Sequence, residues 1–377
     1  MIYKTFKDKK LSALGMGCMR FPILDGDFKK IDEKTTAEMF DYAIQNGVNY
    51  FDTAYMYHGG QSELIVGKLL KKYPRDSYYV ADKFPGVDIS AFGRVEEIFE
   101  EQLQKVGVEY FDFYLFHCLC ENNIEHYLDK DGKYGTCEYL MEQKRKGRIH
   151  HLGFSAHANL ETMRRFLEKY GKVMEFCQLQ INWLDWTYDD AAAKVELLKE
   201  YDIPVWVMEP VRGGKLARLQ PEHEARLKAL RPDESVAAWA FRFLQTKLDC
   251  TMVLSGMSDF EQVKENVQTH CEHKPLTPEE MQVLDGIVTE FMQKLTPCTG
   301  CRYCVEYCPQ GLNIPSLLNT YNEYKFALDG VLAQRSVIRI AEGKRPSDCL
   351  QCKACEEVCP QKIRIADEIA KFAELAK

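Results

Sequence analysis

The segment TTAEMFDYAIQNGVNYFDTAYMYHGG, residues 35–60, contains one unit of the pattern that decides the fold. Its first half places apolar side chains such as Met39 and Phe40 on one face of a helix that ends at Gly47. Its second half begins with VNYFDTA (48–54), a nearly continuous apolar run typical of a parallel strand that is covered on both faces. The segment therefore predicts a helix followed directly by a buried parallel strand.

The same alternation recurs along most of the chain, with amphipathic segments such as SVAAWAFRFLQT (235–246) between the apolar runs. The strand-like runs lie at residues 14–19, 48–54, 78–83, 110–117, 150–157, 176–182, 204–210 and 251–257. Eight such repeats over roughly 250 residues predict an α/β fold of the closed (β/α)8 TIM barrel type. A doubly wound open sheet is the alternative, but it needs a glycine-rich fingerprint after the first strand, and the sequence has none. We expect the barrel to occupy residues 1–292.

Composition and charge limit the possible partners and compartments. The chain has 377 residues and a formal net charge of −8, which argues against nucleic acid or an anionic membrane as a partner. It opens without a secretory signal pattern, and no stretch approaches the roughly 18 apolar residues of a membrane-spanning helix. Eight of the 15 cysteines fall in two tight runs, which in such a chain indicates metal binding before disulfides. We expect a cytoplasmic protein that makes no membrane contact.

Polar side chains follow most of the predicted strands where each strand ends. In parallel barrels these carboxyl ends converge on one face, which is where the chemistry takes place. Packing does not account for so many polar and titratable groups at these ends, so the sequence predicts an active site there. The residues concerned are Asp52, Tyr57, Lys83, His117, Ser155, Gln178 and Glu209.

These residues lie in motifs that resemble the aldo-keto reductase family over about residues 1–290. The family pattern Asp-Thr-Ala-x-x-Tyr reads here as DTAYMY (52–57), and Lys83 in VADK and His117 in DFYLFH match its lysine and histidine. Three later segments also match family signatures: KGRIHHLGFSAH (146–157), QLQINWLD (178–185) and VMEPVRGGKL (207–216). The resemblance implies an oxidoreductase that interconverts a carbonyl compound and an alcohol.

The resemblance also implies catalytic roles for Asp52, Tyr57, Lys83 and His117. Reduction of a carbonyl needs a proton donor and a group that polarises the oxygen. A tyrosine hydroxyl has an unperturbed pKa of about 10, and the Lys83 ammonium is expected to lower that of Tyr57. Asp52 would keep Lys83 charged, and His117 would donate a hydrogen bond to the substrate oxygen. Tyr55 is expected to pack below Tyr57.

A nicotinamide cofactor is implied as well. The family's cofactor contacts correspond to Ser155, Gln178, Met208, Gly256, Gln262, Glu265 and Asn266. Here Gly256 and Gln262 replace the lysine and arginine that typically bind the 2′-phosphate of NADPH, while Ala156 and Met208 replace an asparagine and an aromatic residue. NADH is therefore a reasonable cofactor beside NADPH, and a barrel that binds no nicotinamide is the alternative.

Two cysteine runs near the C-terminus, CTGCRYCVEYCP (298–309) and CLQCKACEEVCP (349–360), share the spacing C-x2-C-x2-C-x3-C-P. This spacing holds [4Fe–4S] clusters in two-cluster ferredoxins, where the fourth cysteine of each run binds the other cluster. Zinc is the alternative, but two complete copies with both prolines disfavour it. The predicted ligand sets are Cys298, Cys301, Cys304 and Cys359 for one cluster, and Cys349, Cys352, Cys355 and Cys308 for the other.

The residues between the runs look helical, so residues 293–377 are expected to form a mainly helical dicluster ferredoxin-like domain. The main functional hypothesis is an iron–sulfur oxidoreductase whose two clusters carry electrons to or from the barrel, with an external electron carrier as a candidate partner. The first alternative is an NAD(P)H-dependent reductase whose clusters are structural or redox-sensing. The second is an electron-transfer protein with a non-catalytic barrel, which gives no reason to keep four catalytic groups together.

Overall fold

The computed structural model describes residues 1–298, 300–325, 336–338 and 340–377. The chain forms two compact units, one of residues 1–213 and 237–277, the other of residues 214–236 and 278–377. The division between residues 292 and 293 stays a prediction.

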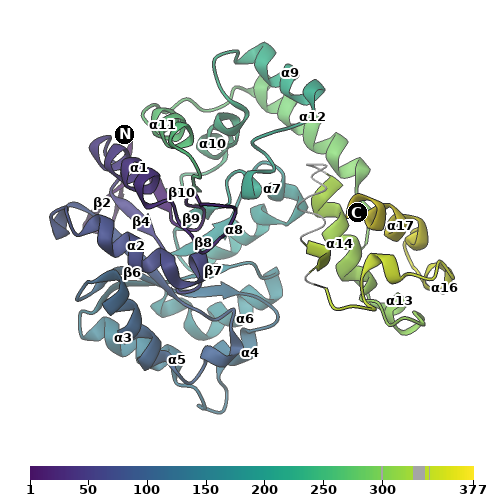
Figure 1. Cartoon of the computed structure of the whole chain (residues 1–377), viewed down its shortest axis with the longest axis horizontal. Helices are drawn as coiled ribbons and strands as arrows, with labels where there is room; N and C mark the ends of the chain where they lie inside the picture. Colours follow the sequence, from purple (N-terminus) through teal and green to yellow (C-terminus); the bar gives the residue numbers. More distant parts are fainter. Residues whose placement is uncertain (299, 326–335, 339) are drawn as a thin grey trace. The chain divides into compact units, whose positions relative to one another are not determined.

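The first unit contains a closed barrel of eight parallel strands, in the order β10-β3-β4-β5-β6-β7-β8-β9 (Figure 1). All eight predicted strands are confirmed, with boundaries within a few residues of those expected. Their bounds are β3 (Leu14–Gly17), β4 (Tyr50–Asp52), β5 (Tyr79–Phe84), β6 (Phe111–Leu119), β7 (Ile149–Ala156), β8 (Cys177–Gln180), β9 (Val205–Met208) and β10 (Met252–Gly256).

Helices connect successive strands and cover the outside of the barrel (Figure 1). The first, α1 (Glu33–Gln45), shows how the sequence sets its ends: Asp32 accepts the Thr35 N–H as N-cap, and Gly47 takes a positive φ just after the helix. The others are α2 (Gln61–Leu70), α3 (Val95–Val106), α4 (Ile124–Leu128), α5 (Thr136–Arg145), α6 (Leu160–Tyr170), α7 (Asp185–Tyr188), α8 (Ala191–Glu200), α10 (Val236–Lys247) and α11 (Phe260–Thr269).

A short hairpin, β1 (Tyr3–Phe6) and β2 (Lys9–Ser12), precedes the barrel and was not predicted. Phe6 at its tip packs edge-on against Phe176 and Trp206, with ring centroids 6.2 and 5.7 Å apart. These aromatic rings belong to the buried core inside the barrel. The hairpin therefore closes the amino end of the barrel and leaves the carboxyl ends of the strands for the site.

The second unit is helical in its described parts. Its helices are α9 (Pro221–Leu230), α12 (Pro278–Lys294), α13 (Tyr303–Glu306), α14 (Ile314–Lys325), α16 (Ala354–Glu357) and α17 (Ile365–Leu375). The predicted helical connector between the cysteine runs is present as α14, and residues 326–335 and 339 lie outside the described residues. In the part of the chain that the structure describes, no helix has the length and apolar character needed to cross a membrane.

Candidate active site and cluster sites

Lys83 lies at the centre of the polar group at the carboxyl end of the barrel. Its side chain is 1% exposed, and its ammonium donates to Asp52 Oδ1 at 2.5 Å and to the Thr53 carbonyl at 2.6 Å. A third contact, at 3.4 Å, reaches the Tyr57 hydroxyl. Because β4 and β5 are neighbours in the barrel, the predicted Asp52, Tyr57 and Lys83 meet as expected.

A tight turn after β4 directs Tyr57 back over the barrel mouth. His58 and Gly59 both take positive φ there, and α2 begins immediately after Gly60. The Tyr57 ring packs edge-on against His117, with ring centroids 5.9 Å apart and an interplanar angle of 77°. His117 ends the apolar part of β6, so the fourth predicted catalytic residue also lies beside Tyr57.

Burial controls the protonation of these groups. It raises the pKa of Tyr57 more than the Lys83 ammonium lowers it, so the expected lowering is not seen in the structure as it stands. Burial alone would lower the pKa of Lys83, but Asp52 and Tyr57 raise it overall. Burial and the Lys83 charge hold the pKa of His117 well below its usual range. Near neutral pH the site therefore combines a protonated phenol, a charged ammonium and a neutral imidazole.

Ser155 and Gln178 lie opposite each other on the neighbouring strands β7 and β8. Gln178 Nε2 donates to Asp52 Oδ2 at 2.6 Å, which connects this predicted cofactor residue directly to the catalytic group. Ser155 Oγ accepts the Cys118 backbone N–H at 2.8 Å. Both side chains are buried, and a hydroxyl beside an amide suits the carboxamide of a nicotinamide.

The remaining predicted cofactor positions lie at the ends of β9 and β10 and on α11. Met208 ends β9 and Gly256 ends β10. The Gln262 side chain forms hydrogen bonds with residues just before it in the sequence. It accepts the Ser258 N–H at 2.9 Å and donates to the Asp259 carboxylate at 2.7 Å. Among the described residues, no hydrogen bond or ion pair joins these positions to the catalytic group, in contrast to Gln178.

Asn266 and Glu265 differ in exposure although they are adjacent on α11. Asn266 is buried and donates to Ser255 Oγ at 3.1 Å, which connects the second half of α11 to the end of β10. Glu265 is exposed. Asn266 therefore has a structural contact of its own, and its role toward a cofactor stays a prediction.

His58 has a clear structural role that the sequence did not reveal. Its Nε2 accepts the Phe21 backbone N–H at 3.1 Å, and its Nδ1 donates to the Phe28 carbonyl at 2.7 Å. The imidazole also stacks between these two aromatic rings. His58 thus fixes the loop after β3 beside Tyr57.

Tyr55 points away from the site, as its hydroxyl donates to Glu101 on α3 at 2.8 Å and its ring contacts the Lys105 ammonium. This contrasts with Tyr57, two residues later, which faces Lys83.

Cys118 is not an activated nucleophile, because burial raises the pKa of its thiol to about 12.

Two hollows in the second unit are each lined by four cysteines. One is lined by Cys298, Cys301, Cys304 and Cys359. The other is lined by Cys308, Cys349, Cys352 and Cys355. Each hollow thus takes three cysteines from one run and the fourth from the other, as in the predicted crossed sets.

The donor chemistry of these hollows fits an iron–sulfur cluster, because four thiolates are the ligands of a [4Fe–4S] centre. Among the described residues, no three His, Cys, Asp or Glu side chains are arranged to hold one metal ion. The cysteines instead line two hollows, and each set would hold one cluster.

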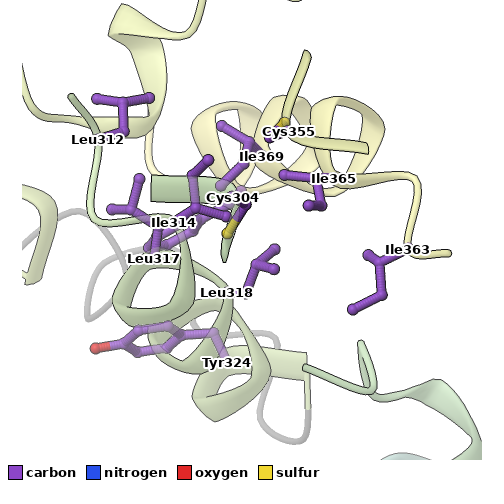
Figure 2. Packing of buried hydrophobic residues seen from close by; sticks show 11 residues of the cluster. Cys304, Leu312, Ile314, Leu317, Leu318, Tyr324, Cys355, Ile363, Ile365 and Ile369 are labelled. Carbon is purple, nitrogen blue, oxygen red and sulfur yellow. The ribbon is translucent and has the colours of Figure 1, made fainter. Parts of the chain in front are cut away.

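Six of the eight cysteines, all except Cys301 and Cys352, also belong to the apolar core of this unit or pack against it. Figure 2 shows Cys304 and Cys355 among the side chains of Leu317 and Ile365, and both cysteines are buried. The clusters would therefore be held within the core that joins α13, α14, α16 and α17.

A polar network connects the segment before the first cysteine run to the last helix. Glu368 on α17 forms an ion pair with Lys325 at 2.5 Å and accepts from the Thr296 hydroxyl at 2.5 Å. Burial alone would raise the pKa of Glu368. The contacts that its carboxylate makes with Lys325, Lys371 and Thr296 outweigh this effect and lower the pKa to about 2. This carboxylate therefore stays charged at neutral pH and holds three segments of the unit together.

Two models of known families match the chain, one over most of the barrel and one over the cysteine-rich region. The model of the aldo/keto reductase family matches residues 13–289, and the model of the 4Fe-4S dicluster domain matches residues 297–364. The second match covers both cysteine runs up to Arg364, so the cysteine-rich region is a 4Fe-4S dicluster domain.

Several named proteins are similar to the barrel. The "Probable aldo-keto reductase 1" of Glycine max is 29% identical over 54% of this chain and 57% of the soybean protein. The "NADH-specific methylglyoxal reductase" of Escherichia coli is 27% identical over 69% of this chain and 90% of that protein. A solved aldo-keto reductase from Bacillus halodurans, in its holo form, is 26% identical with a TM-score of 0.58, covering 76% of this chain and 96% of that one.

Proposed function

This chain belongs to the aldo/keto reductase family, and from that membership we propose that its barrel interconverts a carbonyl compound and an alcohol while two [4Fe–4S] clusters take part in electron transfer. The observation that carries the proposal is the contact of Lys83 with both Asp52 and the Tyr57 hydroxyl, with His117 edge-on to the same phenol ring. A proton donor, a fixed charge beside it and a neutral imidazole are the groups that carbonyl reduction requires.

In the direction of reduction, a bound nicotinamide supplies a hydride to the carbonyl carbon. Tyr57 transfers its hydroxyl proton to the carbonyl oxygen, and the Lys83 ammonium stabilises the phenolate that remains. His117 is neutral and donates an N–H hydrogen bond to the same oxygen, where negative charge develops. One hydride and one proton convert the carbonyl into the alcohol, and solvent returns a proton to Tyr57.

Support for a nicotinamide comes from the pair Ser155 and Gln178 beside Asp52. NADH and NADPH are both candidates, and the absence of a cation at Gly256 and Gln262 makes NADH reasonable. The name of the Escherichia coli relative, which calls that protein NADH-specific, supports the same choice.

The exposure of one cysteine in each set supports electron exchange at the clusters. Cys301 and Cys352 are exposed, while Cys304 and Cys355 in the same two sets are buried. Each cluster would therefore have one corner near the surface, where an external electron carrier can approach it. Each cluster accepts one electron, so the pair matches the two electrons of one hydride.

A structural role of the clusters is the second candidate, because most of the cysteines pack in the apolar core of their unit. In that case the barrel alone would reduce the substrate, and the redox state of the clusters would not change during turnover. Loss of the clusters would then affect stability before activity.

The test compares two tyrosine variants of anaerobically purified protein. With methylglyoxal and other small carbonyl compounds, and with NADH or NADPH, Tyr57→Phe should lower kcat about 10²–10⁴-fold because the proton donor is lost. Tyr55→Phe is the matched control, since Tyr55 contacts Glu101 on α3, and its rate should stay within about threefold of the wild type. Equal activity of Tyr57→Phe and wild type would refute the proposed chemistry.

A further inference from the structure

One basic residue lines each of the two cysteine hollows in the second unit. Arg302 lines the hollow that contains Cys301, and Lys353 lines the hollow that contains Cys352. Each cation directly follows that cysteine, which is the exposed one of its set. No acidic side chain lines either hollow in the part of the chain that the structure describes. Each cluster site therefore has one positive charge on the side where a cysteine is exposed.

Arg302 and Lys353 hold corresponding positions in the two cysteine runs, and both take a backbone conformation that favours glycine. Their φ angles are 67° and 63°, in the left-handed region, where any side chain is strained. At another matched pair of left-handed positions one run does have glycine, since Gly300 corresponds to Gln351. Both runs thus place a long cation where glycine would be free of strain, which indicates that the charge itself has a role.

The two cations are not neutralised by a carboxylate. Both residues are exposed, and among the described residues no hydrogen bond or ion pair engages the Arg302 guanidinium or the Lys353 ammonium. Other lysines of the same unit do have partners: Lys371 pairs with Glu368, for example. An iron–sulfur cluster with four thiolates carries a net negative charge, and its reduction potential depends on the charges around it. An unpaired cation beside such a cluster stabilises the form with one more electron.

We propose that Arg302 and Lys353 set the reduction potentials of the two clusters, each raising the potential of the cluster in the hollow that it lines. Uptake of one electron breaks no bond and adds one negative charge, which the neighbouring cation stabilises. The donor is dithionite in the experiment below, and a nicotinamide or a one-electron carrier in the proposed function. A higher potential lets a weaker donor reduce the clusters. The inference requires the clusters but not the carbonyl chemistry, so either can fail without the other.

The experiment is an anaerobic redox titration with dithionite, in which the EPR signal of the reduced clusters gives the midpoint potentials. Arg302→Gln and Lys353→Gln remove the charge and keep a long side chain. Each should lower the equilibrium constant for reduction of one cluster about three- to tenfold, which is a fall of about 28–59 mV for one electron. The double variant should lower both midpoints. Because both cations are exposed, about 1 M KCl should shrink the differences.

Three further variants separate the local charge from other effects. Arg302→Lys keeps the charge and should keep the wild-type midpoints. Lys228→Gln, on α9, removes an exposed cation of the same unit that lines neither hollow, so its midpoints should also stay unchanged. Arg302→Gly removes both the charge and the backbone strain, so it should hold both clusters even if Arg302→Gln does not, and its midpoint should fall by the same factor.

Iron content per chain shows that each variant holds both clusters before its potentials are compared. The inference is wrong if Arg302→Gln or Arg302→Gly, together with Lys353→Gln, keeps the wild-type midpoints at full iron content. An equal fall in Lys228→Gln would also overturn it, because the net charge of the protein would then set the potentials. The kcat of Tyr57→Phe tests the barrel chemistry separately.

Discussion

At the scale of single residues, Lys83 shows why this site tolerates a buried charge. An ammonium has three N–H groups, and here it has three oxygen neighbours: Asp52, the Thr53 carbonyl and the Tyr57 hydroxyl. A buried charge is stable when its donors are satisfied and a counter-charge is near. The arrangement therefore holds a permanent positive charge within reach of the phenol.

A second buried polar group lies on the other face of β5 and was not predicted. Asp82 and Glu63 are both fully buried, and Gln102 Nε2 donates to both carboxyls at 2.8 and 3.1 Å. Burial raises the pKa of Asp82 well above its usual range, and the neighbouring Glu63 carboxylate raises it further. The folded protein therefore keeps a proton on this pair at pH values where the unfolded chain releases it.

This retained proton gives a prediction for stability against pH. The pKa of Asp82 is higher in the folded protein than in the unfolded chain, where it is about 4. Folding therefore becomes less favourable as the pH rises from about 4 to the pKa that Asp82 has in the folded protein. Asp82→Asn mimics the protonated carboxyl, so its stability relative to the wild type should increase with pH, by up to about 1.4 kcal/mol per pH unit within this window. Thermal unfolding midpoints measured between pH 5 and 8 test this.

The control for that measurement is Asp112→Asn. Asp112 is also buried, but it forms an ion pair with Arg75 at 2.7 Å and accepts the Val80 N–H. Its replacement should destabilise the protein at every pH in this range. A constant difference between Asp82→Asn and wild type from pH 5 to 8 would contradict a shared proton on the pair.

At the scale of elements, the hairpin β1–β2 closes the amino end of the barrel through one residue. Phe6 is 5% exposed and contacts four aromatic or imidazole rings: Phe113, His151, Phe176 and Trp206. The other side chains of its strand are exposed or half-buried. The stability of this closure therefore depends on Phe6.

We expect Phe6→Ala to lower the free energy of unfolding by about 3–5 kcal/mol, the usual cost of truncating a buried phenylalanine. The catalytic group lies at the opposite end of the barrel, so kcat of the folded protein should change little. Thr5→Ala, an exposed change on the same strand, should cost less than about 0.5 kcal/mol. Denaturant unfolding of the wild type, Phe6→Ala and Thr5→Ala measures the loss of stability, and kcat of the same three proteins measures the effect on catalysis. A large fall in the kcat of Phe6→Ala without a fall in its stability would be evidence that the hairpin does more than close the barrel.

The eight barrel strands were predictable because continuous apolar runs are typical of strands buried on both faces. The hairpin was not, since YKTFKDKKLS is mostly polar and only Phe6 and Leu11 enter the core. The raised pKa of Tyr57 was also missed. Motif spacing placed Lys83 beside it, but the burial that outweighs this charge depends on residues distant in the sequence.

At the scale of the whole molecule, the two cysteine runs depend on each other. Each hollow takes its fourth cysteine from the other run, so neither run would complete a cluster alone. This arrangement was predictable from the spacing, because three cysteines of one run reach three corners of a cube and the fourth cannot turn back to the same cube.

Paired substitutions distinguish crossed from local ligation. If ligation is crossed, Cys298→Ser with Cys359→Ser removes two ligands of one cluster and should leave about half of the iron. Cys298→Ser with Cys308→Ser then damages both clusters and should leave much less. Iron content and EPR spin quantitation of both double variants provide the measurement, and the reverse order of iron content would indicate local ligation.

The most direct test of a barrel and clusters that act as one redox enzyme is an anaerobic titration with NADH and, separately, NADPH. The broad iron–sulfur absorbance and the EPR signal of the reduced clusters are followed. We expect at least one nucleotide to bleach the absorbance, with one equivalent reducing both clusters because it carries two electrons. If dithionite reduces the clusters but neither nucleotide does, the clusters take no electrons from a nicotinamide bound in the barrel, and the central proposal is contradicted.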